Sequence, residues 1–348
     1  MRRLVVVMMW WVAQAAAQAG EPWPAGRAKL DEAVHALRAM EAGLPRITAA
    51  AEAAAERYVA GDTLAVRGGG LAWAVGHCSG GLADDLGLPD GEIVTQHTAE
   101  GVTIIVGNGR WELPRPGPPE LAHATSAALA WTFRCELFAA CTRLGKVPVL
   151  RTSAVLDPRQ RRLVRYRDQR FHHDVRLDPI APGEAGRAYL RAVAAVLHDV
   201  GTTSWPAMVA TSEAMRRAVA GGGHVRVMTG PAYVGHQLAH CNTLTAWVAD
   251  TALTRHDVLM VVGHEAPEPP RYLDWHALQL TRIPARTVWL YNGPDIRPGD
   301  IPRGGIHLDP QWPLGDGLVR IPGYDVRLGP ALPVVLPAIV SVLDASWP

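Results

Sequence analysis

The feature that most restricts the fold of this chain is a set of short, unbroken apolar runs that end in glycine-containing loops. Residues 102–106 (Val-Thr-Ile-Ile-Val) lead into Gly-Asn-Gly, and residues 258–262 (Val-Leu-Met-Val-Val) lead into Gly-His-Glu. Each run is followed by a proline-containing loop and then by a helical stretch. An apolar run between helices is typical of a parallel strand that is covered on both faces. The pattern therefore predicts an α/β fold with mainly parallel sheets.

This order of elements occurs twice along the chain. An apolar run at 64–66 precedes the first glycine loop, and its counterpart lies at 225–228. Third apolar runs, at 147–150 and 287–290, follow the later helix of each half. Because a whole succession of helices and strands recurs, the repeat predicts two tandem α/β domains and not a solenoid of small units.

We expect these domains at residues 46–156 and 186–348. Residues 20–45 are expected to form an N-terminal helix that ends at Pro45, before a second helix begins. The segment 157–185 is rich in Arg, Asp and Pro and is expected to be an exposed linker. The chain is 48% apolar and 19% charged, which is enough for a buried core. Its net charge of +1 argues against a nucleic-acid partner.

The first nineteen residues have the pattern of a secretory signal peptide. A cationic start, Met1-Arg2-Arg3, precedes an apolar stretch at 4–17 and a small-residue Ala17-Gln18-Ala19 site. Cleavage after Ala19 would release an exported protein, periplasmic or extracellular, with no membrane contact. The alternatives are an uncleaved anchor and a buried helix of the fold.

Four cysteines are present. Cys135 and Cys141 lie six residues apart in one helical stretch, so their side chains point to different faces and cannot bond to each other. A bond between Cys78 and Cys241 is compatible with export, and buried free thiols are the simpler interpretation.

The repeated succession of helix, strand and glycine loop resembles tandem sugar isomerase (SIS) domains. Residues 257–263 are similar to the second strand of such a domain. Residues 307–323, with an aspartate-bearing strand and a Pro-Leu-Gly-Asp-Gly-Leu-Val turn, are similar to the tail of an uncharacterised SIS subfamily, as are 328–333 and the closing apolar helix. The resemblance covers about residues 46–346. It implies a three-layer αβα, Rossmann-like sandwich in each half, a sugar or sugar phosphate ligand, and a homodimer.

The ligand loops differ from those of the family. SIS domains use Gly-x-Gly-x-Ser and Ser-x-Ser-Gly-x-Thr loops, whose hydroxyls and amides hold a phosphate at a helix N-terminus. The second-half loops here read Thr-Gly-Pro-Ala-Tyr at 229–233 and Gly-His-Glu-Ala-Pro at 263–267. They have lost most hydroxyls, their prolines lack N–H donors, and Glu265 would repel a phosphate. The first-half loops keep glycine and gain arginine, so an anion is expected there.

Ligands of open α/β sheets bind at the carboxyl ends of the strands. The residues that follow the expected strands are therefore the candidate ligand-binding set, and Arg151 and Ser153 would suit a carboxylate or a phosphate. This set comprises Gly68, Gly69, Asn108, Arg110, Arg151, Ser153, Thr229, Gly230 and Tyr233.

The candidate catalytic residues are Glu265, His264 and His236. An imidazole beside a carboxylate at a strand end is suited to acid/base work, with Glu265 as base and a histidine moving protons; an exposed loop pair is the alternative. His236 and His240 have the spacing of two metal ligands on one helix face, but two ordinary histidines are the favoured interpretation. We therefore expect no metal and no cofactor.

Three further groups have a functional and a structural interpretation. His172, His173 and Asp174 are expected to form a solvated linker loop, although they have the chemistry to reach a cleft. The loop at 76–81 is expected to form a ligand rim. Arg134 and Glu136 interrupt an apolar helix, where structural pairing is the default and a ligand role is the alternative.

These patterns lead to three possible functions. The first is recognition of a sugar, expected to be anionic, without turnover. The second is an aldose–ketose isomerase that uses Glu265 and a histidine. The third is a structural or interaction protein whose ligand loops have decayed.

Overall fold

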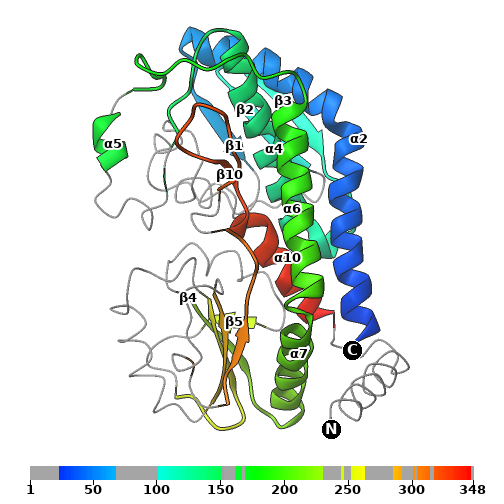
Figure 1. Ribbon diagram of the computed structural model, residues 1–348. Coiled ribbons are helices and arrows are strands. Elements are labelled where there is room, and N and C mark those ends of the chain that lie inside the picture. The colour runs from blue at the N-terminus through cyan, green and yellow to red at the C-terminus, as the bar shows by residue number, and fades with distance from the viewer. Residues whose placement is uncertain are drawn as a thin grey trace, which may run out of the picture.

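The computed structural model describes residues 23–67, 101–150, 152, 161–166, 169–229, 244–246, 252–262, 285–291, 301, 304–313 and 317–345. Long helices lie along one side of the molecule (Figure 1). They are α2 (Pro24–Ala60), α4 (Ala122–Arg143), α6 (Glu184–Thr202) and α7 (Trp205–Ala220). The expected signal segment and the loop at 76–81 lie outside the described residues. No helix in the described part of the chain is long and apolar enough to cross a membrane.

Helix α2 begins at Pro24, whose fixed φ suits the first helical position, and ends at Gly61, which adopts a φ of 116°. It runs unbroken through Pro45, so the expected end of a helix at that residue is wrong. A proline inside a helix removes one backbone hydrogen bond. Leu44 and Ile47 on either side of it are buried in the core, and this packing holds the helix together across the missing bond.

Helix α4 is buried on nearly every side, since each residue from Ala127 to Thr142 is buried. It follows a short 3-10 turn, η2 (Pro119–Leu121), and packs against both α2 and α6. An all-round apolar helix of this kind belongs in the centre of a fold. Cys135 and Cys141 lie in it as buried free thiols, which confirms that they do not bond to each other. Burial raises the pKa of the Cys141 thiol to about 12.

The two charged residues inside the apolar part of α4, Glu136 and Arg134, contact different kinds of groups. The buried Glu136 carboxylate accepts hydrogen bonds from Thr48 Oγ1 (2.9 Å) in α2 and from the backbone N–H groups of Gly183 (2.8 Å) and Gly186 (2.6 Å). Gly183 is the N-cap residue of α6 and Gly186 lies in its first turn, and the helix has no capping side chain of its own. Glu136 thus caps α6 from another helix, and a carboxylate is stabilised by the positive end of the helix dipole. The Arg134 guanidinium lies 5.1 Å from the ring centroid of Trp131.

The first sheet contains β1 (Leu64–Arg67), β2 (Gly101–Val106) and β3 (Gly109–Pro114), in the order β1-β2-β3. Both pairings are antiparallel, so the expectation that 102–106 is a parallel strand is wrong. Strand β2 buries alternate residues, with Thr103 and Ile105 only partly covered. Its two-residue turn to β3, at Gly107 (φ 56°) and Asn108, is typical of a tight hairpin.

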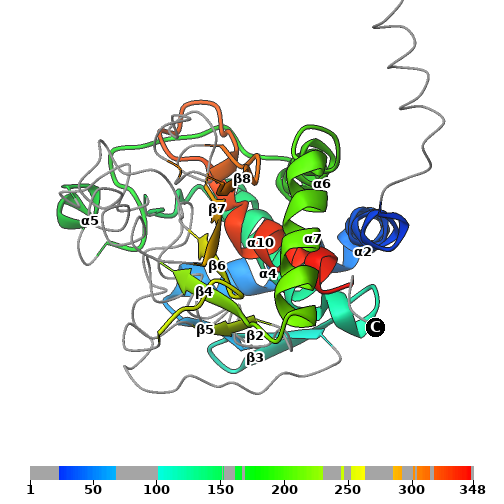
Figure 2. The ribbon, with the colours of Figure 1, turned by 90° about the horizontal axis from the view of Figure 1, so that it is seen from below.

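The second sheet has five strands in the order β5-β4-β6-β7-β8, and every pairing is parallel. They are β4 (Val225–Thr229), β5 (Leu244–Ala246), β6 (Val258–Val262), β7 (Arg286–Leu290) and β8 (Ile306–Leu308). Every residue of β6 is buried, as expected for a central strand with both faces covered. Figure 2 shows the strands in this order, with α7 and α10 (Leu332–Asp344) on one side of the sheet. The α/β class with a parallel sheet is therefore confirmed for the second half.

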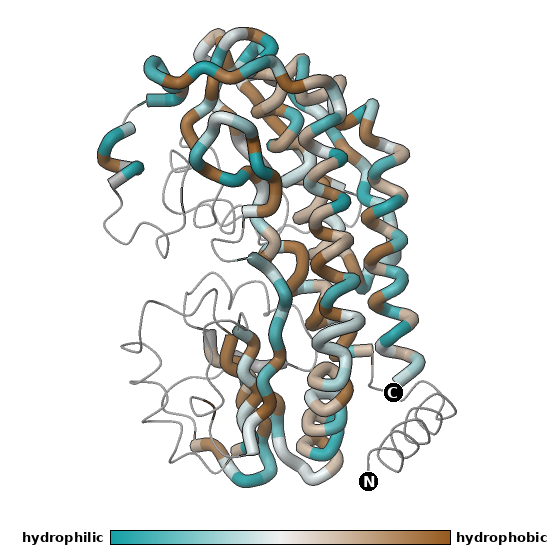
Figure 3. Tube along the Cα trace, in the orientation of Figure 1, coloured by the Kyte–Doolittle hydropathy of each residue, from teal (hydrophilic) through white to brown (hydrophobic). Residues whose placement is uncertain are grey.

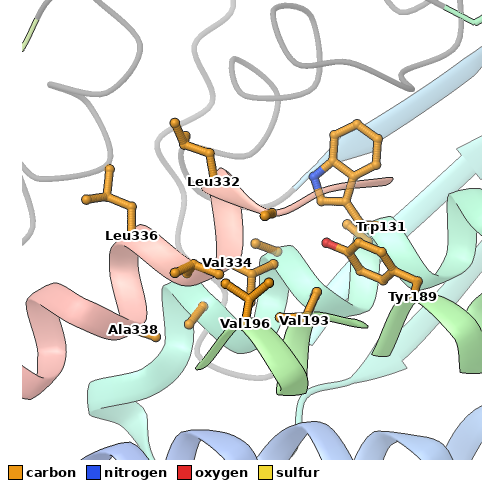
Figure 4. Packing of buried hydrophobic residues seen from close by; sticks show 14 of the residues in the cluster. Trp131, Tyr189, Val193, Val196, Leu332, Val334, Leu336 and Ala338 are labelled. Atoms are coloured by element: carbon orange, nitrogen blue, oxygen red, sulfur yellow. The ribbon is translucent and has the colours of Figure 1, made fainter. Parts of the chain in front are cut away.

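Helix α10 crosses the middle of the molecule and contacts α2, α4, α6 and α7 (Figure 1). It follows the antiparallel pair β9 (Gly317–Val319) and β10 (Leu328–Pro330). Figure 3 shows α10 as predominantly hydrophobic, whereas hydrophilic residues recur along α2. In Figure 4, Val334 of α10 lies among Trp131 of α4 and Val193 and Val196 of α6. One continuous hydrophobic core includes residues of both sheets and of all these helices.

The linker is not uniformly exposed. Residues 161–165 form the short helix α5 (Arg161–Arg165), and Phe171 makes an isolated antiparallel bridge with Pro148. His172 is buried and donates its backbone N–H to the carbonyl of Val147 (2.8 Å), so the expected solvated loop at this residue is wrong. The sequence of the linker is polar, but several of its polar groups have partners inside the fold.

Replacing Glu136 by alanine is expected to destabilise the protein by about 3 kcal/mol or more, because buried N–H and hydroxyl groups would lose their acceptor. Glu52→Ala is the matched control, since Glu52 is exposed and pairs with Arg143 across 3.0 Å at the surface. That change should cost less than about 1 kcal/mol. Urea unfolding of both variants measures the difference, and equal losses would contradict the capping role of Glu136.

Two glycine-to-alanine changes in helices should have opposite signs. A Cβ at Gly43 would meet nothing within 4 Å, so Gly43→Ala should stabilise the protein by about 0.5–1 kcal/mol through helix propensity. A Cβ at Gly186 would lie 2.8 Å from Leu44 Cδ1 and 3.0 Å from Glu136 Cγ, so Gly186→Ala should be destabilising by about 1–3 kcal/mol. Thermal unfolding measures both; a stabilising Gly186→Ala would show that this contact is not tight.

Candidate functional site

The candidate site lies at the carboxyl edge of the parallel sheet. Strand β4 has β5 on one side and β6 on the other, so the chain moves in opposite directions from β4. Such a reversal is the topological switch point at which open α/β sheets bind ligands. Thr229, the last residue of β4, is the register partner of Val262, the last residue of β6. The segments that follow these two strands in the sequence therefore start from adjacent points.

Most of the second-half candidates lie outside the described residues. These are Gly230, Tyr233, His236, His264 and Glu265, together with the side chain of Thr229. The structure describes only the ends of the strands that they follow in the sequence. Gly230 follows Thr229 directly, and His264 and Glu265 follow Val262 by two and three residues.

Tyr291 follows β7 at the same edge of the sheet. Its side chain is buried beside Trp289, with ring centroids 6.0 Å apart. Burial raises the pKa of Tyr291 to about 12, so the hydroxyl is neutral at physiological pH. The backbone carbonyl of Tyr291 lies 3.0 Å from His307 Nε2, and because a carbonyl only accepts, this nitrogen must carry the proton.

Asp309 follows β8 and forms a corner with the start of α7. Its Oδ1 accepts from the backbone N–H of Gln311 (2.9 Å), and its carbonyl accepts from Ser204 Oγ (2.6 Å). Gln311 Nε2 in turn lies 3.2 Å from Ser204 Oγ. Gln311 has a φ of 60°, the one positive φ of a non-glycine residue in the described part of the chain. The strand-end rule could have added Asp309 and Tyr291 to the sequence-based candidates, since both follow an apolar run directly.

The first-half candidates have other surroundings. Asn108, in the turn of the β2–β3 hairpin, accepts a hydrogen bond through Oδ1 from Arg57 Nη1 of α2. Arg110 pairs with Glu112 across 2.7 Å at an exposed position. Figure 1 shows this sheet at the opposite end of the molecule from the parallel sheet. The structure therefore does not bring Asn108 and Arg110 to the carboxyl edge. Gly68, Gly69, Arg151 and Ser153 lie outside the described residues.

Asp257 marks the opposite, amino edge of the sheet. Its carboxylate accepts hydrogen bonds from the backbone N–H groups of His224 (2.7 Å) and Thr254 (2.6 Å) and from Thr254 Oγ1 (2.8 Å). Burial raises its pKa, but these hydrogen bonds outweigh burial and hold the pKa below its usual value. Asp257 thus closes the turn before β6 and is a structural residue.

Two other features do not extend the site. Among the residues that the structure describes, no group of three His, Cys, Asp or Glu side chains could hold a metal ion. His236 and His240 lie outside them. A groove of about 790 Å³ runs along α2 and is also lined by His198 of α6 and by Gly117 and Pro118. It contains none of the residues that the sequence analysis singled out.

The pH dependence of stability should report on Tyr291. Its pKa is higher in the folded protein, about 12, than the ordinary value of 10.0, so the folded state keeps its proton longer than the unfolded state does. The contribution is complete below pH 10 and is lost as the pH rises toward 12. Tyr291→Phe should therefore lose less unfolding free energy than the wild type between pH 9 and pH 11 in urea titrations. An identical loss would show that Tyr291 is not buried as a neutral hydroxyl.

The described part of the site thus consists of adjacent strand ends, a neutral tyrosine and a fixed aspartate corner. Such an edge can offer hydrogen-bond donors and acceptors to a small polar molecule. No protein-family model matches the chain, and a search of the curated proteins gives no match either.

Proposed function

We propose that this chain is an exported SIS-like protein that binds a sugar or sugar phosphate at the carboxyl edge of its parallel sheet. In this proposal residues 1–19 are a cleaved signal peptide, and the mature protein is periplasmic or extracellular. The observation that carries the binding proposal is the strand order β5-β4-β6-β7-β8, because it creates a switch point between β4 and β6.

The finer fold assignment is also part of the proposal. The second half, residues 186–348, is assigned to a three-layer αβα SIS-like domain, supported by the parallel sheet and by α7 on one of its faces. A tandem first domain at 46–156 has less support, since its described strands are antiparallel. A homodimer is an implication of the family resemblance alone.

The proposed ligand contacts come from the segments that follow β4 and β6 in the sequence. Thr229 ends β4 and precedes Gly230 and Tyr233, and His264 and Glu265 come soon after β6. Sugar hydroxyls both donate and accept hydrogen bonds, so a carboxylate, an imidazole and backbone amides at small residues suit them. Glu265 favours hydroxyls over phosphate at its own position, so a phosphorylated ligand would place its phosphate elsewhere.

Binding is tested by thermal unfolding with a panel of hexoses, hexose phosphates and hexosamine phosphates. A ligand at 100 times its Kd should stabilise the folded protein by about 2.7 kcal/mol, which raises Tm by a few degrees. Glu265→Gln should weaken binding of the ligand that gives this shift, whereas the exposed Glu52→Gln should not. No shift with any member of the panel would contradict the proposal and favour an interaction protein.

Turnover is tested separately on the same ligands. An aldose–ketose isomerase would interconvert the two sugar forms, with Glu265 as base and His264 or His236 moving protons. Activity that survives Glu265→Ala would exclude this residue as the base. Binding without any interconversion would support the non-catalytic form of the proposal.

A further inference from the structure

Five side chains far apart in the sequence meet where the linker contacts the rest of the fold. They are Arg162 of α5, His172 and Asp174 of the segment that follows it, and Tyr324 and Asp325 of the turn between β9 and β10. Tyr324 Oη lies 3.0 Å from Arg162 Nη2 and 3.0 Å from His172 Nε2. Arg162 also pairs with Asp325. We name these five residues the linker latch.

The latch completes the hydrogen bonds of a buried stretch of backbone. The fully buried Leu150 donates its N–H to Tyr324 Oη (3.0 Å), and its carbonyl accepts from Arg162 Nε (2.9 Å). Tyr324 Oη donates to the carbonyl of Pro148 (2.9 Å). If Arg162 and Tyr324 moved away, these buried backbone groups would lose their partners, which is costly.

A positive charge on His172 would oppose this arrangement. Its side chain is fully buried, and Nε2 lies 3.3 Å from Arg162 Nη2, a group that can only donate hydrogen bonds and so favours a lone pair on Nε2. The ring also lies edge-on to Tyr166, with centroids 4.4 Å apart, and to Tyr324, at 5.5 Å. An imidazolium here would place a second positive charge beside the guanidinium. Its Nε2–H would compete with Arg162 for Tyr324 Oη, which already accepts hydrogen bonds from Leu150 and Arg162.

The nearby carboxylates do not remove this conflict. Asp174 Oδ1 is 3.4 Å from His172 Nδ1, but Asp174 also pairs with Arg165 across 2.9 Å. Asp325 is exposed and pairs with Arg162. Burial of the ring and then the charge of Arg162 lower the pKa of His172 below 6.5, against the opposing effect of both aspartates.

We propose that the linker latch is an acid-released switch. Neutral His172 keeps Arg162 and Tyr324 hydrogen-bonded to the backbone of Leu150. Protonated His172 displaces Arg162, and the linker then loses its contacts with residues 147–150. None of these hydrogen bonds joins His172 to α4 or α10. Tyr324 also packs its ring on Phe138 of α4, with centroids 5.5 Å apart, and this contact does not involve His172, so we expect release to be local. This inference goes beyond the proposed function and does not depend on it, because none of its residues belongs to the carboxyl edge of the parallel sheet.

The test is hydrogen exchange of the full chain, corrected for the intrinsic effect of pH. Between pH 7.5 and pH 5.0, the amides of Val149, Leu150 and His172 should lose protection, by up to about tenfold for each pH unit below the ordinary histidine pKa of 6.5 until the lowered pKa of the latched ring is reached, whereas those of α4 should not. His172→Gln removes the titrating group and should abolish this pH dependence. His173→Gln is the matched control, since this exposed neighbour should leave it unchanged.

A second variant keeps the test decisive if His172→Gln destabilises the fold. Asp174→Asn removes a carboxylate that stabilises the imidazolium in the latched form, so it should lower the pKa of the latched ring, followed by NMR titration, and enlarge the loss of protection between pH 7.5 and pH 5.0. A smaller pH-dependent loss in Asp174→Asn than in the wild type, equal release in His172→Gln, or loss of protection in α4 at the same pH would each overturn the proposal.

Discussion

The arrangement of the helices depends on one buried carboxylate. Glu136 projects from the middle of α4, accepts a hydrogen bond from the Thr48 hydroxyl of α2, and accepts two more from N–H groups at the start of α6. A carboxylate fully removed from water must have all its acceptor sites engaged, so the three helices can approach only in the one geometry that provides these donors. Gly186 leaves the space for this approach, since a Cβ there would lie 3.0 Å from Glu136 Cγ. The helices so fixed provide the surface on which α10 and the parallel sheet pack.

The second half of the chain was the more predictable one from its sequence. The runs at 225–228, 258–262 and 287–290 are rich in apolar residues at consecutive positions, as is typical of strands with both faces covered. The run at 102–106 looks similar, but it is followed by a two-residue turn and by the alternating Arg110, Trp111 and Glu112. The short turn and the alternation of polar and apolar residues indicate a β-hairpin, but the apparent repeat of the two halves favoured a parallel strand instead.

The remaining errors concern contacts between distant residues. A proline ends many helices, but the burial of Leu44 and Ile47 in the core keeps α2 continuous, and no local pattern carries that information. Arg162 and His172 meet Tyr324 across more than 150 residues of sequence, so their polar character alone suggested an exposed linker. For the candidate site, the strand-end rule placed Thr229 at the end of a strand that is indeed parallel, whereas for Asn108 it was applied to a strand that is not.

The burial of α10 also has a consequence for biosynthesis. This helix is the last described element to be synthesised, and it contacts α2 from the start of the described chain as well as α4 and α6. Until α10 has been synthesised, the facing apolar surfaces of these helices are uncovered, so the nascent polypeptide should stay open and accessible to chaperones up to that point. Contacts between such distant parts of the sequence also slow the final step of folding, since a large loop must close before they form.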